Sequence, residues 1–329
     1  MLKIGVLGAG HLGKIHLKCI QLASDHLELI GFYDTDSANA KKVSSELSIK
    51  AFDDIDQLID AVDIVDIVTP TTTHYELAKR VITKGKHLFI EKPITHTVEE
   101  AEELLQLSGE YQVKVQVGHV ERFNPALLAL NADQLNPKFI EAHRLAIFNP
   151  RGTDVSVVLD LMIHDIDIIL SMIDSEVSQI SANGVAVVSP TPDIANARIE
   201  FKNGAVANVT TSRISMKQMR KVRLFQKDAY INLDFLEKQA QVIRMFDKED
   251  KEVQKLDNLM ELQTPDSTKY IHIDMPPIEP INAIKMELET FAESIEQNKR
   301  PRVSIEDGYK ALKVAYDIIH EIETKANSL

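Results

Sequence analysis

The sequence predicts an α/β protein with an N-terminal parallel sheet and a following α+β region whose large sheet is mostly antiparallel. Short β-branched runs alternate with longer helical patterns from Lys3 to Val117, which is typical of a parallel sheet flanked by helices. After about Gly118 this rhythm stops, and strand-like alternation dominates from Ser178 to Ile273. The length of 329 residues favours two domains, which we expect at residues 1–120 and 121–329.

The N-terminal elements follow from apolar runs bounded by turn residues. Five strands are expected, at Ile4–Leu7, Glu28–Tyr33, Ile64–Val68, His87–Ile90 and Val113–Val117. Four helices are expected between them, around Lys14–Ala23, Ser37–Leu47, Tyr75–Lys84 and Val98–Ser108. Thr97 with Glu100 forms a capping-box pattern that marks the start of the last of these helices.

The C-terminal half is predicted to contain a helix, a strand and a helix, followed by several strands in succession. The first three are expected at Pro125–Ala132, Phe139–Phe148 and Ile163–Ile173. The later strands are expected at Ala195–Phe201, Ala205–Thr211, Ala229–Leu233 and Gln241–Phe246, with turns at Asn203-Gly204 and Asp247–Lys251. No helix or strand is predicted for Asp257–Pro280. Two helices end the chain: one carries the apolar stripe Ile284, Leu288, Phe291 and Ile295, and the other begins at the capping pair Ser304 and Asp307.

Composition excludes several classes of partner. Lys and Arg total 37 against 50 Asp and Glu, a formal net charge of −13, which disfavours nucleic acid and anionic membrane surfaces. No apolar run approaches the length of about 18 residues that a membrane span needs. The single cysteine, Cys19, cannot form an internal disulfide, and no export pattern opens the chain. We therefore expect a cytoplasmic protein.

A glycine-rich turn directly follows the first expected strand. The segment is Gly8-Ala9-Gly10-His11-Leu12-Gly13. Gly8 permits a tight turn, Gly10 lets the backbone approach a pyrophosphate, and Gly13 allows the helix to pack closely on the strand. The backbone from Gly8 to Gly13, including His11 and Leu12, is the expected cofactor-binding segment, because a helix N-terminus attracts phosphate. The pattern alone is weak, but a strand precedes it, a helix follows it and an acid ends the second strand.

That acid is Asp34, which is 21 residues beyond Gly13. A carboxylate at this position accepts hydrogen bonds from the adenosine ribose hydroxyls. Asp34 and Asp36 would repel a 2′-phosphate, and no Lys or Arg follows before Lys41, so NAD is expected rather than NADP. The alternative is that Asp34 only caps the next helix.

Glu91-Lys92-Pro93 comes right after the fourth expected strand. Ligands of open α/β sheets bind at the carboxyl ends of the strands, so Lys92 is expected to face the nicotinamide end of the cofactor. The alternative is a solvated surface lysine, the commonest place for that residue.

In this order, these motifs resemble the Gfo/Idh/MocA oxidoreductases, the family of glucose–fructose oxidoreductase and inositol dehydrogenase. The matches run along nearly the whole chain: Gly8–Gly13 with His16, Thr69-Pro70 and His74, Gly85-Lys86-His87, Glu91-Lys92-Pro93, Arg122-Phe123 with Pro125, Asp160 with His164-Asp165, and Pro301 with Asp307-Gly308. The resemblance implies a Rossmann domain and a C-terminal domain with a large open sheet, through which a homodimer or homotetramer would form. It also implies that Lys92, Asp160 and His164 are catalytic.

The residue types agree with alcohol oxidation. Neutral His164 can accept the hydroxyl proton near neutral pH, and Lys92 can steady the developing alkoxide. Asp160 is four residues before His164, so one helical turn would place both on one face, toward the substrate. A histidine buried in a core is the competing interpretation.

Further site residues are expected around these. Thr69, Pro70, His74 and Glu91 are expected at the cofactor, although His74 can equally be a helix-start residue without a ligand. Arg122 and His119 are expected at the substrate, although Arg122 can instead pair with a surface acid. His119 departs from the family pattern and adds a second titratable group, so its role stays open. No metal site is expected, because His164, Asp165 and Asp167 are too closely spaced to face one ion.

The segments 117–125 and 160–167 resemble the branch of the family that acts on nucleotide sugars, above all at C3 of UDP-N-acetylglucosamine. His143, Arg144 and Arg151 are cations that could meet a substrate diphosphate, or they are ordinary strand-end residues. Two other functions remain open: an NAD-dependent glycosidase or epimerase-like relative with internal redox cycling, and a non-catalytic regulator that binds a dinucleotide. The sequence leaves undecided which hydroxyl reacts, in which direction, and the size of the oligomer.

Overall fold

The computed structural model describes residues 1–131, 135–149, 155–251, 253–265 and 267–326. The chain divides into two compact units, one formed by Met1–Phe123 with Asn282–Lys313 and the other by Asn124–Ile281 with Val314–Leu329. Each unit is therefore formed by two separate stretches of the chain. Within the described residues, no helix is both long enough and apolar enough to cross a membrane.

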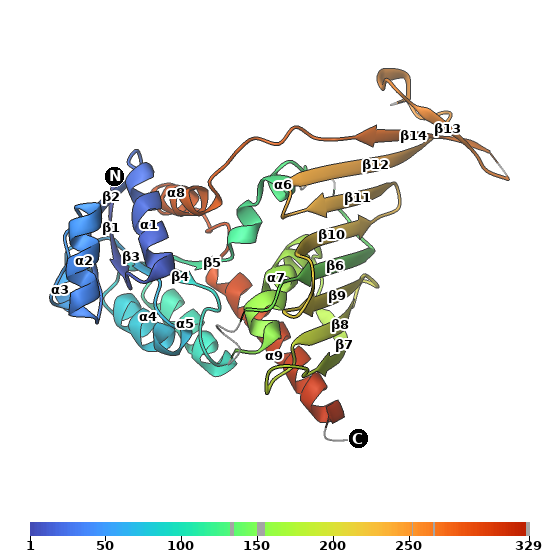
Figure 1. The fold of residues 1–329 in the computed structure, drawn as a ribbon. Coiled ribbons are helices and arrows are strands. Elements are labelled where there is room, and N and C mark those ends of the chain that lie inside the picture. The colour runs from blue at the N-terminus through green and yellow to red at the C-terminus, as the bar shows by residue number, and fades with distance from the viewer. Residues whose placement is uncertain (132–134, 150–154, 252, 266, 327–329) are drawn as a thin grey trace. The chain divides into compact units, whose positions relative to one another are not determined.

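The first unit is built on a five-stranded parallel sheet in the order β2-β1-β3-β4-β5 (Figure 1). Its strands are β1 (Leu2–Leu7), β2 (Leu27–Tyr33), β3 (Ile64–Ile67), β4 (His87–Glu91) and β5 (Val115–Gly118). Its helices before residue 123 are α1 (His11–Leu22), α2 (Ser37–Leu47), α3 (Ile55–Asp60), α4 (His74–Thr83) and α5 (Val98–Glu110). The predicted parallel α/β sheet is confirmed. Helix α3 was not predicted, because six residues are too few to show helical periodicity.

Local sequence signals explain how these elements begin. Thr97 and Glu100 form the predicted capping box, with each side chain bonded to the other residue's backbone N–H. Asp36 caps α2 by accepting hydrogen bonds from Ala38 and Asn39. Later in the chain, α8 (Ala283–Glu296) returns to this unit and packs against α1, burying Leu288 and Phe291 of its predicted apolar stripe.

The second unit is built on a nine-stranded sheet in the order β13-β14-β12-β11-β10-β6-β9-β8-β7 (Figure 1). Its strands are β6 (Phe139–Leu145), β7 (Val177–Val185), β8 (Ile194–Phe201), β9 (Val206–Ser212), β10 (Met219–Phe225), β11 (Ala229–Asp234), β12 (Gln239–Asp247), β13 (Met260–Gln263) and β14 (Thr268–Asp274). Only β6 and β9 pair in parallel among these neighbours, so the expected mostly antiparallel sheet is confirmed. Strands β13 and β14 occupy the segment for which the sequence predicted no element.

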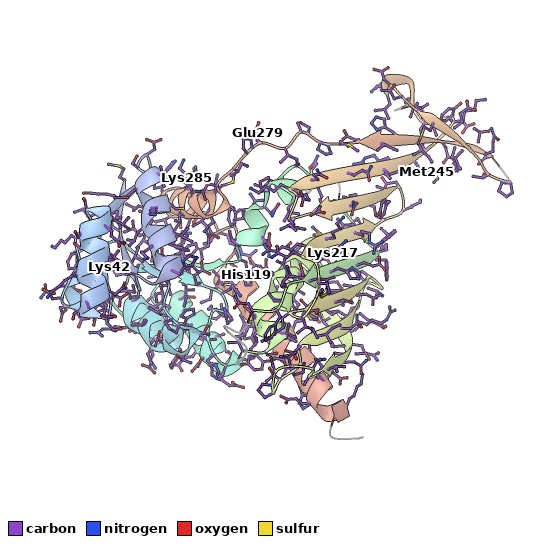
Figure 2. The ribbon with its side chains drawn as sticks, in the orientation of Figure 1. Lys42, His119, Lys217, Met245, Glu279 and Lys285 are labelled. Atoms are coloured by element: carbon purple, nitrogen blue, oxygen red, sulfur yellow. The ribbon has the colours of Figure 1, made fainter. Side chains whose placement is uncertain are left out.

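One face of this sheet is buried and the other is half-exposed. On β6, Ile140, Ala142 and Arg144 are buried, and α7 (Ile163–Met172) packs against β6 and β9. On the opposite face, the ring of Phe225 lies 5.7 Å from that of Phe139 and 5.0 Å from that of Tyr230, centroid to centroid. Exposed apolar side chains continue onto β12, where Met245 is 46% exposed (Figure 2).

The remaining helices are short or terminal. Helix α6 (Pro125–Leu128) stops before the predicted end at Ala132, which lies outside the described residues. The predicted strand Phe139–Phe148 ends earlier, at Leu145. Helix α9 (Ile305–Ala326) begins after Ser304, whose backbone N–H donates to Asp307 as the capping pair predicts.

Candidate active site

The glycine-rich turn after β1 has the geometry that the motif predicts. Gly8 has a φ of +95°, and a Cβ there would lie 2.6 Å from the Val68 carbonyl oxygen. A Cβ on Gly13 would lie 2.0 Å from the Gly8 carbonyl oxygen, so only glycine fits. A Cβ on Gly10 would meet no atom within 4 Å, and no side chain caps the first N–H groups of α1. This open, donor-lined turn fits a dinucleotide pyrophosphate.

Asp34 follows β2 and is tied to the same turn. Its carboxylate accepts hydrogen bonds from the backbone N–H of Ala9 at 2.8 Å, from that of Asp36 at 2.8 Å and from the Asn39 amide at 3.0 Å. The helix cap of α2 is Asp36, so the alternative in which Asp34 is only that cap does not hold. A half-buried carboxylate at the end of β2 is the acceptor that an adenosine ribose needs.

His74 links the segments that follow β3 and β4. Its Nδ1 is 2.9 Å from the Pro93 carbonyl oxygen, and its Nε2 is 2.9 Å from the Thr69 carbonyl oxygen. Burial lowers the pKa of His74, although these carbonyl contacts oppose it. A neutral imidazole has one N–H, so it donates to one carbonyl at a time. Buried His74 thus holds the Thr69-Pro70 segment beside the Lys92-Pro93 segment, and Pro70 itself is exposed.

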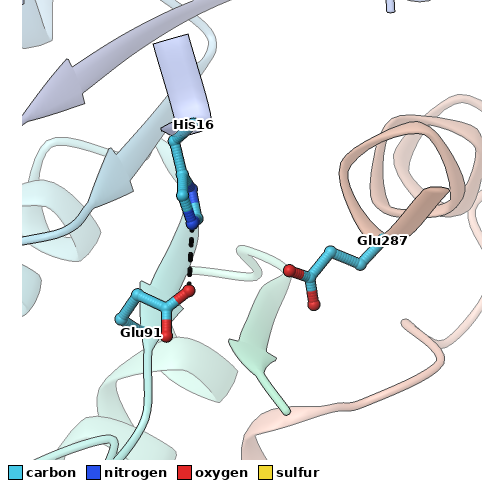
Figure 3. A group of neighbouring side chains, drawn as sticks. All are labelled: His16, Glu91 and Glu287. Atoms are coloured by element: carbon cyan, nitrogen blue, oxygen red, sulfur yellow. Dashed lines mark ion pairs between the residues drawn. The ribbon is translucent and has the colours of Figure 1, made fainter. Parts of the chain in front are cut away.

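Glu91 and Lys92 stand at the carboxyl end of β4, where Lys92 is half-buried. The Lys92 backbone N–H donates to Glu91 Oε2 at 3.2 Å. Glu91 Oε1 lies 3.1 Å from Nε2 of His16, and His16 Nδ1 lies 2.9 Å from Asp66 (Figure 3). The Glu-Lys-Pro segment is therefore anchored to a buried polar cluster.

His119 and Arg122 follow β5 in the same unit. His119 is 1% exposed, and Arg122 is half-buried on the short helix η2 (Val120–Phe123). Arg302 stacks over the ring of Phe123 at 5.2 Å, and partial burial with the nearby Arg122 guanidinium lowers its pKa.

Asp160 and His164 belong to the second unit. Asp160 lies in η4 (Val158–Met162), a π-helical turn that leads directly into α7, which carries His164. Both side chains are half-buried. The helical turn expected between them is present, with π-helical bonding rather than α-helical bonding at Asp160. Such insertions are frequent at functional sites.

A buried ion pair fixes the start of α7. Arg144 on β6 donates from Nε and Nη2 to the two carboxylate oxygens of Asp165, each at 2.9 Å. Arg144 is 3% and Asp165 2% exposed. The Arg144 guanidinium therefore pairs with Asp165. Its strand neighbour His143 faces the other side of the sheet. His143 and Arg144 therefore do not face one anion together, and Arg151 lies outside the described residues.

The residues expected at the cofactor share one edge of the first unit's sheet with His119, which was expected at the substrate. Gly8 follows β1, Asp34 follows β2, Thr69 follows β3, Lys92 follows β4 and His119 follows β5. The parallel strands end at this edge, as ligand sites of open α/β sheets require. The first unit thus gathers the expected cofactor residues, and the second unit carries Asp160 and His164 on one helical segment.

Sequence reasoning missed Asp66, Glu287 and Arg302. Asp66 interrupts the apolar run of β3, and a charged residue inside a buried parallel strand was an available signal. Glu287 lies on the same helical face as the apolar stripe of α8, which was also visible. Arg302 is distant in sequence from Arg122, and nothing in the sequence pairs them.

Comparisons with known proteins agree with this architecture. Residues 2–119 match the oxidoreductase family model with the NAD-binding Rossmann fold, and residues 131–230 match the GFO/IDH/MocA C-terminal domain. The chain is 39% identical over 236 residues to UDP-N-acetylglucosamine 3-dehydrogenase of Acidithiobacillus ferrooxidans, covering 71% of this chain and 74% of that protein. It is 30% identical over 231 residues to scyllo-inositol 2-dehydrogenase (NAD(+)) of Bacillus subtilis, covering 65% of this chain and 68% of that protein.

A solved structure extends the likeness to the whole chain. A crystal form of the Acidithiobacillus ferrooxidans UDP-N-acetylglucosamine 3-dehydrogenase superimposes with a TM-score of 0.86 at 31% identity, covering 98% of each chain. Fold and site together define an oxidoreductase that uses a nicotinamide dinucleotide and acts on CH–OH groups. The chain belongs to the Gfo/Idh/MocA family.

Proposed function

We propose that the protein is an NAD-dependent dehydrogenase that oxidises a secondary hydroxyl of a sugar or nucleotide sugar, with UDP-N-acetylglucosamine at C3 as the leading substrate. The observation that carries the proposal is the shared sheet edge, where Lys92 follows β4 and the open glycine turn follows β1. A reactive ammonium group at the same edge as a dinucleotide turn is the arrangement that hydride chemistry needs.

The preference for NAD over NADP rests on Asp34. Its carboxylate is held toward the glycine turn by the Ala9 N–H, where it would accept bonds from ribose hydroxyls and repel a 2′-phosphate. The neighbouring Asp36 adds a second negative charge as the cap of α2. NAD would be held by the segment from Gly8 to Gly13, by Asp34 and by the Thr69-Pro70 segment.

The proposed chemistry divides the reaction between Lys92 and His164. Bound NAD supplies a hydride acceptor at its nicotinamide ring. His164 accepts the hydroxyl proton, and the Lys92 ammonium hydrogen-bonds to the oxygen as its negative charge develops. Asp160, on the turn before His164, orients the imidazole or binds a substrate hydroxyl. The carbinol carbon becomes a ketone, and its hydrogen leaves as the hydride.

A nucleotide-sugar substrate is supported by the pair of Arg122 and Arg302. Partial burial first and the Arg122 charge second lower the pKa of Arg302, and a diphosphate is an anion of the kind that arginine side chains bind. The relative that acts on UDP-N-acetylglucosamine by name gives the same indication. His119 is buried, and its carbonyl oxygen accepts the backbone N–H of Arg122 at 2.9 Å. We propose it at the same substrate site, and its role stays a prediction.

A panel of substrates with NAD and NADP tests this proposal. Free sugars, inositols, UDP-glucose and UDP-N-acetylglucosamine are each incubated with the purified protein, and reduced cofactor is followed by absorbance. We expect net NADH formation, with kcat/KM for a UDP-sugar at least about tenfold above that for the free sugar, equivalent to about 1.4 kcal/mol of transition-state binding.

Three outcomes would count against parts of the proposal. Equal kcat/KM for free sugars and UDP-sugars would remove the nucleotide-sugar assignment. Faster turnover with NADP would remove the role given to Asp34. Conversion of substrate without net NADH would indicate an epimerase-like or glycosidase relative, in which oxidation and reduction cancel within each turnover.

Oligomerisation through the nine-stranded sheet is also proposed. Its half-exposed face carries the ring cluster of Phe139, Phe225 and Tyr230, and exposed methionines lie on β12 and β13. Apolar side chains on an open sheet face are typical of protein–protein contacts. A homodimer or homotetramer through this face stays a prediction.

A further inference from the structure

His16 lies between two carboxylates in the interior of the first unit. Its Nδ1 is 2.9 Å from Asp66 Oδ2, and its Nε2 is 3.1 Å from Glu91 Oε1. The side chains of His16 and Asp66 are 0% exposed. Nδ1 is hydrogen-bonded to Asp66, whereas the Nε2–Oε1 contact has the length of an ion pair without the geometry of a hydrogen bond. Carboxylates on both sides of a buried imidazole favour its protonated form. The contacts therefore indicate an imidazolium that bridges α1, β3 and β4.

Glu91 connects this imidazolium to Lys92. Its second oxygen, Oε2, accepts the backbone N–H of Lys92 at 3.2 Å. A Cβ at residue 118 would lie 2.7 Å from Glu91 Oε1, so Gly118 at the end of β5 leaves the space that the carboxylate occupies. The Glu91 side chain is thus confined on one side by His16 and on another by β5, with its remaining oxygen directed to the peptide before the Lys92 side chain.

Glu287 on α8 is the third acid of this cluster. Figure 3 shows its carboxylate directed toward Glu91, and one ligand atom from each of His16, Glu91 and Glu287 lies within 4.8 Å of the others. Glu287 is 0% exposed, and its two carboxylate oxygens have no hydrogen-bond partner among the described residues. Burial, with Glu91 nearby, holds its pKa well above the ordinary value, against the effect of His16. A neutral carboxylic acid is the form that suits this place.

We propose that His16 is a positioning residue for Lys92, acting as an imidazolium that holds the Glu91 carboxylate against the Lys92 peptide. The inference rests on the proposed function in one respect, because Lys92 is given its catalytic role there. The groups that face His16 are Asp66 from β3, Glu91 from β4, Glu287 from α8 and the edge of the Phe89 ring, whose centroid is 5.8 Å away.

A proton on His16 is favoured over a metal ion between the same side chains. One imidazole and two glutamates are donors that a divalent cation would accept. However, His16 and Glu91 already contact each other directly at 3.1 Å, and the second nitrogen of His16 is committed to Asp66. Two protons, one on His16 and one on Glu287, give the cluster the same charge as one divalent cation would.

The first measurement is the protonation state of His16. Nuclear magnetic resonance of protein labelled with ¹⁵N in its histidines reports whether both ring nitrogens carry a proton. We expect His16 to be an imidazolium at pH 7.5, about one unit above the pKa of an ordinary imidazole. Its signal is assigned by its loss in His16→Gln, or by its proximity to the Phe89 ring if that variant does not fold. A neutral His16 at this pH would overturn the proposal.

The second measurement is the kinetics of His16→Gln beside the control His26→Gln. His26 is also on the first unit and also lies near a glutamate, Glu293 at 3.7 Å, but that pair is partly exposed. We expect His16→Gln to lower kcat by about tenfold or more, with KM for NAD changed less than about twofold, because the Lys92 peptide loses its anchor and the glycine turn does not. The control is expected to keep wild-type kcat.

These results separate the inference from the proposed function. A wild-type protein that oxidises no sugar would end the proposed function and, with it, the positioning role, whatever the state of His16. A wild type that turns over while His16→Gln keeps its kcat would end the positioning role alone. Metal analysis completes the test. If the purified wild type contains one equivalent of divalent metal and His16→Gln does not, a metal ion and not a proton on His16 holds this cluster, and the proposal is overturned.

Discussion

Glu287 has surroundings that conflict with an ionised side chain. It is fully buried, and its carboxylate oxygens have no hydrogen-bond partner among the described residues. An unpaired buried charge is so unfavourable that the group keeps its proton instead. Because its pKa is raised in the folded state, the folded protein holds a proton that the unfolded chain loses above about pH 4.5. This group therefore makes the free energy of unfolding fall as pH rises.

The variant Glu287→Gln removes this pH-dependent cost while keeping the shape of a neutral acid. We expect the variant to match the wild type near pH 4.5 and to become more stable than the wild type as pH rises toward 8, by at most about 1.4 kcal/mol per pH unit. Urea unfolding at several pH values measures the difference. Glu289→Gln, on the same helix but paired with Lys285 at 3.1 Å, is the control and should show no such trend. A constant difference across the range would contradict a protonated Glu287.

At the residue scale, the sequence predicted those positions whose chemistry is local. Gly8, Gly13 and Asp34 have the geometry that their motif requires, because a turn between a strand and a helix fixes its own backbone. The partners of His16 were not predictable in the same way. Asp66, Glu91 and Glu287 come from three other elements, and only tertiary packing brings them to one imidazole.

The element that carries Asp160 and His164 depends on one ion pair in the interior. Arg144 on β6, in the interior of the sheet, holds Asp165 at the first turn of α7 by two hydrogen bonds. Breaking a buried pair by removing one partner leaves an uncompensated charge. The position of His164, adjacent to Asp165, should therefore depend on Arg144.

The variant Arg144→Met tests this dependence. We expect it to lower the free energy of unfolding by about 3–5 kcal/mol, because the buried Asp165 carboxylate loses the charge of Arg144 and two hydrogen bonds. The control is Arg198→Met, which removes an ion pair with Glu200. The Arg198 side chain is 47% exposed and that of Glu200 is 40% exposed, so the loss should lower the free energy of unfolding by less than about 1 kcal/mol. Denaturation followed by circular dichroism gives both values. Equal losses in the two variants would show that the Arg144 pair contributes no more than a surface contact.

Elements with a clear periodicity were predicted well, and those without it were missed. The five parallel strands and the helix Ser37–Leu47 came directly from apolar spacing. The π-helical turn η4 was not predictable, because the hydrophobic pattern across Val158–Met162 is the same for either kind of helix. Strand β13 is only four residues long and exposed, and β14 is half-buried over most of its length, so neither shows the long, clearly one-sided apolar pattern that predicts a strand.

On the scale of the whole molecule, the family and the two-part architecture were accessible from the order of the motifs. The sequence did not predict that residues 282–313 return to the first unit, because no local pattern in α8 shows which sheet the helix will cover. The open face of the nine-stranded sheet is likewise visible only once the strands are paired. The proposed catalytic groups are divided between the units: Lys92 comes from the first, and Asp160 and His164 come from the second.

The most direct test of the account is the joint behaviour of Lys92→Met and His164→Ala. Because both groups act on one hydroxyl in the proposed reaction, each variant is expected to lower kcat at least about a hundredfold. Binding of NAD, measured by calorimetry, should persist in both. Lys42→Met on the exposed face of α2 (Figure 2) and His320→Ala on α9 are the matched controls. Near-wild-type turnover in both Lys92→Met and His164→Ala would contradict the account.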